Sequence, residues 1–270
     1  MNCPKISIIM GIYNCADTLD EAVESIINQT YTNWEFIMCD DASTDNTYNV
    51  AQKYVDLYTD KFVLIKNEHN MGLNYTLNKC LNLATGEYIA RMDGDDISLP
   101  QRFEKELNFL MNNPQYSIVS TQMEYFDENG VYGTSDMDEF PVADSFAHGT
   151  PFCHAPCMVK KSAYDAVDGY TIDTKLLRAE DYHLWIKMYS AGYLGCNLQE
   201  VLYQMRNDRN AFARRKFKYR INETYVKYLA VKMLKLPKRK FIYIFKPIVA
   251  GLIPKKMYRY IHKVRLSKNV

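Results

Sequence analysis

The sequence predicts an α/β protein with a mostly parallel central sheet flanked by helices, plus a basic helical C-terminal segment. Three observations support this fold class. Short apolar runs alternate with helix-spaced apolar residues over the first 90 residues. Hydrophobic residues make up 47% and charged residues 24% of the 270 residues, which excludes wholesale disorder, a collagen-like fibre and a polytopic membrane protein. The charged residues also divide into two opposed blocks along the chain.

The first 92 residues are organised as repeated strand–helix units. Residues 6–10 form a mostly apolar run, typical of a buried parallel strand, and Leu19, Val23 and Ile26 then follow with helical spacing. Such alternation implies right-handed βαβ units and a parallel sheet. Strands are expected at 6–10, 34–39, 62–65 and 86–92, and helices at 17–28, 47–58 and 74–84.

The pattern is less regular after residue 100. A helix is expected over 100–111 with Pro100 in its first turn, and a strand over 116–125. Residues 127–150 are rich in Asp, Gly and Ser and predict a loop or short hairpin. A further apolar run follows at 157–159, and residues 181–191 have the spacing of an amphipathic helix.

The net charge of +1 conceals two oppositely charged regions. Residues 1–213 carry a net charge of −16, and residues 214–270 carry +17 with Glu223 as their one acid. The length allows one large α/β domain with an appendage or two small domains. We interpret the charge boundary as a domain boundary, with the α/β domain at 1–213 and a basic helical tail at 214–270.

The seven cysteines are scattered, and several lie in apolar runs. We expect buried free thiols in a reducing compartment. Cys153 and Cys157 flank His154, but no second Cys/His pair with ligand spacing completes a zinc site. No signal peptide is visible, and the apolar run 241–253 is shorter than a membrane span. These features predict a cytoplasmic protein.

Acidic clusters follow two of the predicted strands. Asp40 and Asp41 end the second strand, and Asp93, Asp95 and Asp96 follow the fourth. Ligands of open α/β sheets bind beyond the carboxyl ends of the strands. Like charges gathered there favour a divalent cation, and carboxylates suit Mn²⁺ or Mg²⁺ together with substrate phosphates. The alternative is a solvated loop rich in turn-forming Asp and Gly.

An ordered set of motifs resembles the family 2 glycosyltransferases of GT-A fold. The resemblance spans about residues 4–205. The runs that carry it are 7–14 (SIIMGIYN), 40–45 (DDASTD), 70–73 (NMGL), 86–89 (GEYI), 93–96 (DGDD), 154–159 (HAPCMV), 169–170 (GY) and 179–185 (AEDYHLW). Two positions depart from the usual pattern, since Gly11-Ile12 precedes Tyr13-Asn14 and Ala42 follows the paired acids.

The resemblance implies roles for individual residues. Tyr13 would stack on the nucleotide base, and Asp41 would accept a hydrogen bond from the uracil N–H. Asp93 would contact the ribose or the metal sphere, and Asp95 would bind Mn²⁺ or Mg²⁺ at the diphosphate. Asp181 would be the general base, although an acid in the first turn of a helix also has a purely structural explanation. The acceptor side would involve His154, Glu180 and Trp185; His154 could equally be structural, and Trp185 has the spacing of a core residue.

The implied function is inverting, metal-dependent sugar transfer from a UDP-hexose or UDP-N-acetylhexosamine to a lipid-linked saccharide in cell-surface polysaccharide synthesis. The Gln-x-x-Arg-Trp motif of processive synthases is absent, which favours single additions. One alternative is a nucleotidyl- or phosphotransferase, but no Gly-rich phosphate loop is present. The other is an inert nucleotide-sugar-binding membrane scaffold, which would not need the complete set of acids.

The tail at 214–270 mixes basic residues with aromatic and aliphatic ones, as in 214–220 (RRKFKYR) and 238–245 (KRKFIYIF). This composition is typical of a segment that lies in a membrane interface, where anionic lipid attracts each basic residue by about 1 kcal/mol. We therefore expect peripheral binding at the inner face of the cell membrane. A second interpretation is that the tail packs on the acidic domain. Nucleic acid is not an expected partner, because no recognition motif is present.

Overall fold

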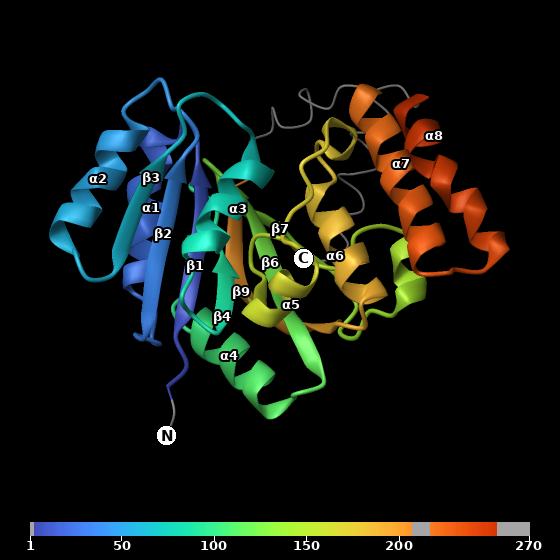
Figure 1. Ribbon diagram of the computed structural model, residues 1–270, viewed down its shortest axis with the longest axis horizontal. Coiled ribbons are helices and arrows are strands. Elements are labelled where there is room, and N and C mark those ends of the chain that lie inside the picture. The colour runs from blue at the N-terminus through green and yellow to red at the C-terminus, as the bar shows by residue number, and fades with distance from the viewer. Residues whose placement is uncertain (1–2, 207–216, 253–270) are drawn as a thin grey trace.

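The computed structural model describes residues 3–206 and 217–252, and Figure 1 shows its arrangement. Alternating strands and helices fill the first part of the chain, as predicted. The strands are β1 (Ile6–Ile12), β2 (Trp34–Asp40), β3 (Phe62–Lys66), β4 (Tyr88–Arg91), β5 (Ile97–Ser98), β6 (Tyr116–Asp127), β7 (Gly130–Thr134), β8 (Met158–Lys160) and β9 (Leu194–Arg206). The α-helices are α1 (Ala16–Ile27), α2 (Thr47–Leu57), α3 (Leu73–Leu83), α4 (Arg102–Asn112), α5 (Lys161–Ala166), α6 (Glu180–Ser190), α7 (Phe217–Met233) and α8 (Lys246–Leu252).

The strands form one mixed sheet with the order β3-β2-β1-β4-β8-β6-β9-β5, and β7 pairs with β6. The first four strands of this order are parallel, which confirms the predicted βαβ arrangement. β8 is antiparallel to both β4 and β6, and it joins the parallel half to the long β6–β9 pair. The carboxyl ends of β2, β1 and β4 therefore lie side by side.

Both faces of the sheet are covered by apolar packing. On one face, Ile8 and Met10 pack with buried residues of α1, α2 and α4. On the other, Ile9 and Ile89 pack with buried residues of α3, α5 and α6. Because strand side chains alternate between faces, the nearly continuous apolar strands supply both cores. All seven cysteines are free thiols, and five of them are buried, in agreement with the expectation.

Two regions add structure that the sequence pattern left open. Residues 127–150 contain β7, which forms a hairpin with β6, and a short 3₁₀ helix η1 (Ala143–Ala147). A second 3₁₀ helix, η2 (Thr174–Leu176), precedes α6. β9 is a 13-residue strand that pairs with β6 through several register shifts, and the pattern analysis did not predict it.

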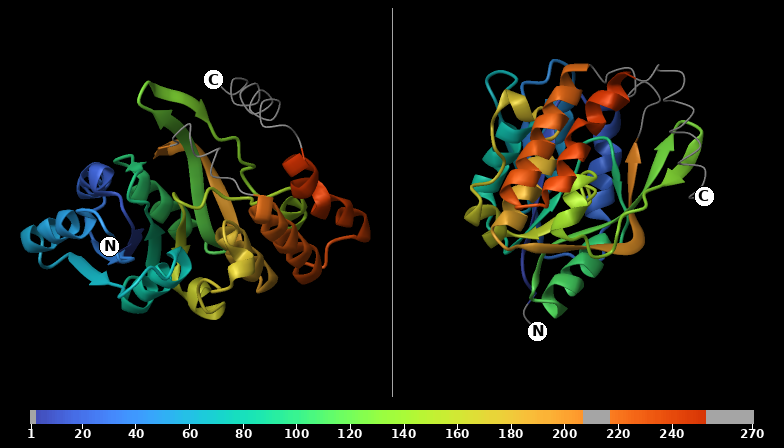
Figure 2. Two further views of the ribbon diagram at one scale, coloured as in Figure 1. Left: turned by 90° about the horizontal axis from the view of Figure 1, so that it is seen from above. Right: turned by 90° about the vertical axis from the view of Figure 1, so that its right-hand side faces the viewer.

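The described part of the tail packs on the sheet-containing part. α7, drawn in orange in Figures 1 and 2, lies along α6. It also contacts η1 and η2. Val226 and Ala230 of α7 are fully buried in the same core as α6. A 3₁₀ helix, η4 (Lys238–Phe245), and α8 then pack on α7. The predicted boundary at 213/214 and the basic runs at 214–216 and 255–260 lie outside the described residues. Among the residues described, no helix is long and apolar enough to cross a membrane.

Candidate active site

The donor-side residues come together at the carboxyl edge of the parallel strands. Tyr13 follows β1, Asp41 follows β2, and Asp93 and Asp95 follow β4. Short contacts join these loops: Thr18 donates a hydrogen bond to the carbonyl of Gly94 at 2.9 Å. The backbone N–H of Asn14 donates to Ser43 at 3.1 Å, which connects the loop after β1 to the loop after β2.

Tyr13 and Asp41 differ in accessibility. The Tyr13 side chain is 48% exposed, so its ring is free to stack on a planar ligand. Asp41 is 4% exposed, and its carboxylate accepts hydrogen bonds from Asn67 Nδ2 and from the backbone N–H groups of Met71 and Gly72, each at 2.8 Å. Asp41 thus holds the loop that starts α3, and its remaining lone pairs are those available to a nucleotide.

The backbone of the loop after β4 packs closely on the side chain of Cys15. A Cβ atom on Gly94 would lie 2.9 Å from Cys15 Sγ, so a larger residue would separate this loop from the one after β1. The neighbouring acid Asp96 is buried and accepts hydrogen bonds from Tyr203 Oη at 3.0 Å and from the backbone N–H of Arg206 at 2.8 Å. These contacts tie the acidic loop to the end of β9.

Negative charge accumulates in this loop. The Asp93 carboxylate is partly buried and accepts a hydrogen bond from Arg91 Nη2 at 2.5 Å. Asp95 stays accessible to solvent, yet desolvation by the surrounding protein and the charge of Asp93 raise its pKa, with Arg206 and Arg91 opposing the shift. Burial and the charges of Asp93 and Asp95 raise the pKa of Asp96 well above its usual value. A cation would relieve this repulsion.

Asp181 and Glu180 lie in the first turn of α6. Desolvation raises the pKa of Asp181 to about 6, and the charge of Glu180 adds to this effect. The backbone N–H of Tyr182 and the charge of Arg91 act in the opposite direction. A carboxyl group with a pKa near 6 is ionised at pH 7 but is a stronger base than an ordinary aspartate, as a general base requires.

His154 packs against Trp185, a residue of the same helix. His154 Nε2 and Tyr170 Oη are hydrogen-bonded at 2.9 Å, and burial together with the charge of Arg91 holds the pKa of His154 well below its usual value. Trp185 is fully buried, with its ring edge-on to Phe152 and His154. Trp185 can therefore act on an acceptor only through His154, whose side chain is partly accessible.

Three residues that the pattern analysis missed hold the acidic loop in place. Tyr203 and Arg206 of β9 bind the loop directly, and Arg206 Nε donates to the carbonyl of Asp95 at 3.0 Å. Arg91 is buried at the end of β4. Arg91 was detectable in principle, since it is a charged residue inside an apolar strand that ends in acids, whereas Tyr203 and Arg206 reach the site through long-range strand pairing.

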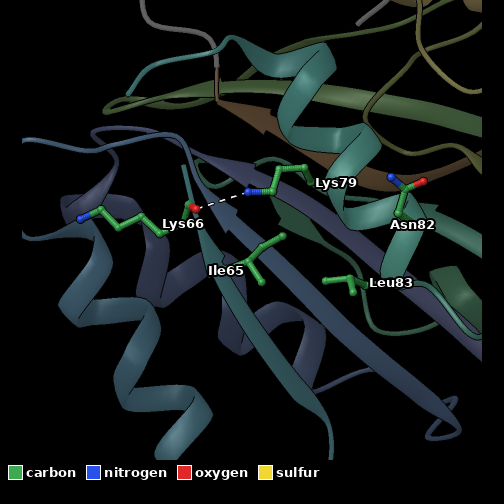
Figure 3. Close-up of a pocket in the computed structure, with 5 residues that line it drawn as sticks. All are labelled: Ile65, Lys66, Lys79, Asn82 and Leu83. Carbon is green, nitrogen blue, oxygen red and sulfur yellow. Dashed lines mark hydrogen bonds between the residues drawn. The ribbon is translucent and has the colours of Figure 1, made fainter. Parts of the chain in front are cut away.

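A separate pocket of 460 Å³ lies between β3 and α3, lined by Ile65, Lys66, Lys79, Asn82 and Leu83 (Figure 3). Lys79 Nζ donates to the carbonyl of Lys66 at 3.3 Å and to Asn67 Oδ1 at 3.0 Å. None of the predicted catalytic or donor-binding residues lines it, so it is a neighbour of the candidate site rather than a part of it.

The mixed sheet, with the acidic loop beyond β4 and α6 beside its antiparallel half, defines the class of this fold, GT-A. Solved structures of other proteins have the same fold. The Staphylococcus aureus protein TarS, in complex with UDP, matches with a TM-score of 0.70 at 18% identity, covering 90% of this chain and 70% of that one. The mannosyltransferase PcManGT of Pyrobaculum calidifontis, in complex with GDP-Man and Mn²⁺, matches with a TM-score of 0.64 at 20% identity, covering 97% and 80%.

The chain belongs to glycosyl transferase family 2, whose model matches residues 7–167. A Bacillus subtilis protein named "Putative glycosyltransferase EpsE" is 46% identical over 263 residues, 97% of this chain and 95% of that protein. An Escherichia coli protein named UDP-Gal:alpha-D-GlcNAc-diphosphoundecaprenol beta-1,3-galactosyltransferase is 32% identical over 272 residues, 96% of each chain. The protein is thus an enzyme, a glycosyltransferase, as the sequence motifs indicated.

Proposed function

We propose that this enzyme transfers a hexose or N-acetylhexosamine from its UDP conjugate to a hydroxyl group of a lipid-linked saccharide, with inversion, in cell-surface polysaccharide synthesis. The observation that carries the proposal is the pairing of an acidic donor-side loop with a raised-pKa carboxyl at Asp181. The E. coli relative that matches over 96% of each chain supports these substrate classes, because its name specifies a UDP-sugar donor and a diphosphoundecaprenol acceptor.

Asp93 and Asp95 would hold Mn²⁺ or Mg²⁺. Their carboxylate oxygens are of the type that these ions bind, and the raised pKa of Asp95 fits a site that is completed by positive charge. No cluster of three acidic, Cys or His ligands occurs among the described residues, so diphosphate and water oxygens would complete the coordination. When bound, such an ion neutralises the charge that develops on the leaving diphosphate.

Asp181 would take the proton from the acceptor hydroxyl as its oxygen attacks the anomeric carbon, opposite the leaving group. One displacement of this kind inverts the configuration. Tyr13 would stack on the uracil and Asp41 would accept its N–H. His154 and Glu180 would position the acceptor from the same side as Asp181, and Trp185 would hold the His154 ring in place.

The test is a transfer assay with a panel of UDP-sugars and a GlcNAc-diphosphate-lipid acceptor, in Mn²⁺ and in EDTA. We expect transfer from one UDP-sugar, with opposite anomeric configuration in donor and product. Asp95→Asn and Asp181→Asn should abolish it, and Asp165→Asn, a change of an exposed acid paired with Lys161, should not. Wild-type rates in the first two variants, with their fold intact, would falsify the proposal.

We also propose that the tail binds the cytoplasmic surface of an anionic membrane, where the acceptor lipid lies. In its described part, two lysines face the rest of the protein: Lys227 Nζ donates to the carbonyl of Ala147 at 3.1 Å, and Lys240 pairs with Asp144 at 2.6 Å. η4 and α8 also carry exposed apolar residues, here called the interface patch: Phe241, Ile242, Phe245, Val249 and Leu252. Exposed Lys238, Arg239 and Lys246 accompany the patch. Apolar area flanked by basic residues is what an anionic interface binds.

Flotation of the full chain with anionic and neutral vesicles tests this docking. Ile242 is 72% exposed in the interface patch, and Leu57 is 64% exposed at the end of α2, far from the tail in Figure 1. We expect Ile242→Asp to weaken binding to anionic vesicles and Leu57→Asp to leave it unchanged. Equal flotation of the two variants and of the wild type would reject the interface patch.

A further inference from the structure

Arg91 is a buried cation at the base of the candidate site. It ends β4, an otherwise apolar strand, and its side chain is 5% exposed. Its backbone N–H donates to the carbonyl of Cys157 at 3.0 Å, and its own carbonyl accepts from Arg102 Nη2 at 2.9 Å. Hydrogen bonds to its backbone N–H and its carbonyl therefore fix the position of Arg91 before any ligand binds.

The guanidinium of Arg91 has one strong partner. Its Nη2 donates to Asp93 Oδ1 at 2.5 Å, and within the described part of the chain its buried Nε–H has no hydrogen-bond partner. A buried charge is costly unless nearby groups compensate it. Burial alone would lower the pKa of Arg91, but Asp93 and other nearby groups raise it, so the group stays protonated.

The same charge acts on both halves of the site. On the donor side it pairs with Asp93 Oδ1 at 2.5 Å, and on the acceptor side it opposes the rise in the pKa of Asp181. It also disfavours the protonated form of His154. β4 thus carries a cation that acts both on the loop that would hold the metal and on the helix that carries the base.

We propose that Arg91 is a positioning residue that fixes the Asp93 carboxylate for the donor and carries a fixed positive charge that acts on the acceptor side of the site. The inference rests on the proposed function of this site. Desolvation and the charge of Glu180 raise the pKa of Asp181, and the charge of Arg91 lowers it. Cys153 and Tyr182, both uncharged, also interact with it. Loss of Arg91 removes the attraction and leaves the repulsion from Glu180.

The direction of the pH effect follows. A nearby cation favours the carboxylate, so its removal raises the pKa at which Asp181 gains a proton. Activity that needs ionised Asp181 then falls off at a higher pH. A residue that only stabilised the fold would lower activity by a similar factor at every pH.

The experiment compares pH profiles of kcat/KM for wild type, Arg91→Gln, Arg91→Lys and Lys5→Gln. Lys5 is the control cation, because it precedes β1 and pairs with Glu35 at 2.7 Å, at the edge of the sheet opposite the candidate site. We expect Arg91→Gln to lose about 10–100-fold in kcat/KM at pH 7, to raise the donor KM, and to move the acid limb up by about one pH unit. Arg91→Lys should retain the wild-type limb with a raised donor KM, and Lys5→Gln should lose stability without a shift of the limb.

An unshifted acid limb together with an unchanged donor KM in Arg91→Gln overturns the inference. If the Gln variant does not fold, an unchanged donor KM in Arg91→Lys overturns it. Far-UV circular dichroism and thermal melts establish which variants fold. The wild type and Asp181→Asn are measured alongside. If wild type transfers sugar and Asp181→Asn does not, an unshifted Arg91 profile rejects this inference alone, whereas an active Asp181→Asn enzyme rejects the function on which it rests.

Discussion

Asp181 combines two properties that a general base needs. It begins a helix, which fixes its backbone, and desolvation raises the pKa of its carboxyl to about 6. The base must be ionised to accept a proton, so activity falls as pH decreases through this pKa. We expect kcat/KM to lose about tenfold per pH unit below 6 and to be flat between 7 and 8.

The matching substitution is Asp181→Asn, which keeps the size of the side chain and removes its basicity. Positioned base catalysis contributes about 10²–10⁴-fold, and kcat should fall by that factor while the donor KM changes little. Initial rates over pH 5 to 9 measure both effects. A variant with a residual rate that still shows the wild-type acid limb would assign that limb to another group.

Ala42 is a residue under local backbone strain. It follows Asp41 with φ 59°, a left-handed conformation that a side-chain-bearing residue adopts at a cost of about 1–2 kcal/mol. Glycine adopts this conformation freely but loses more entropy on folding. We therefore expect Ala42→Gly to raise the free energy of unfolding by up to about 1 kcal/mol, measured by urea denaturation. The same change at Ala84, where φ is −66°, should lower it.

At the scale of elements, Glu35 joins the amino ends of β1, β2 and β4, at the edge of the sheet opposite the candidate site. The carboxylate of this β2 residue accepts hydrogen bonds from Ser7 Oγ at 2.5 Å, Lys5 Nζ at 2.7 Å and the backbone N–H of Thr85 at 2.7 Å. Burial opposes ionisation, but these hydrogen bonds outweigh it and lower the pKa of Glu35 to about 2. The ionised form therefore stabilises the junction of β1, β2 and β4.

The depressed pKa predicts a loss of stability in acid. The contribution of Glu35 is complete above its unfolded-state value of 4.5 and decreases as pH falls from there toward 2. We expect Glu35→Gln to lower the free energy of unfolding at pH 7 by about 1–3 kcal/mol and to flatten the pH dependence of stability between 5 and 3. Urea denaturation at several pH values measures this, and parallel curves for variant and wild type would contradict it.

α7 is anchored by one face and exposed on the other. Val226 is fully buried against the α6 side, whereas Ile221 of the same helix is 54% exposed. Burial of apolar area provides the attachment, since each buried methylene contributes about 0.8 kcal/mol. Val226→Ala should lower the free energy of unfolding by about 1–2 kcal/mol, and Ile221→Ala should change it by less than about 0.5 kcal/mol. Equal effects in thermal melts would indicate that α7 is not part of the folded core.

At the scale of the whole molecule, the parallel half was predictable because each strand–helix unit buries its own apolar stripe. Leu19, Val23 and Ile26 face the sheet within 12 residues of helix, so local spacing is sufficient information. β9 was not predictable in this way, because exposed Glu200 interrupts its pattern and its stability comes from pairing with β6, almost 80 residues earlier. Long-range pairing leaves little trace in local sequence.

The candidate site divides along the same line. Acids that follow strands could be located from sequence, because the ends of parallel strands gather at one edge of the sheet. The raised pKa values of Asp95 and Asp181 could not, since they arise from the atoms that tertiary packing places around each carboxyl. The contact between Arg91 and Asp93 belongs to this second class. The sequence therefore predicts which acids gather at this edge of the sheet, but it does not predict the pKa shifts of their carboxyl groups.

At the scale of the whole molecule, the negative charge of the acidic loop makes donor binding and metal binding depend on each other. The acidic loop repels a free diphosphate, and we expect UDP to bind well only when a divalent ion lies between them. A ligand at 100 times its Kd stabilises a protein by about 2.7 kcal/mol, so UDP with Mn²⁺ should raise the melting temperature by about 5 °C and UDP with EDTA by almost nothing. Asp95→Asn should lose this shift, while Asp60→Asn, which removes the same charge from an exposed loop, should retain it. An equal shift in EDTA, or in Asp95→Asn, would show that UDP binds without the ion and would remove Asp95 from the metal site.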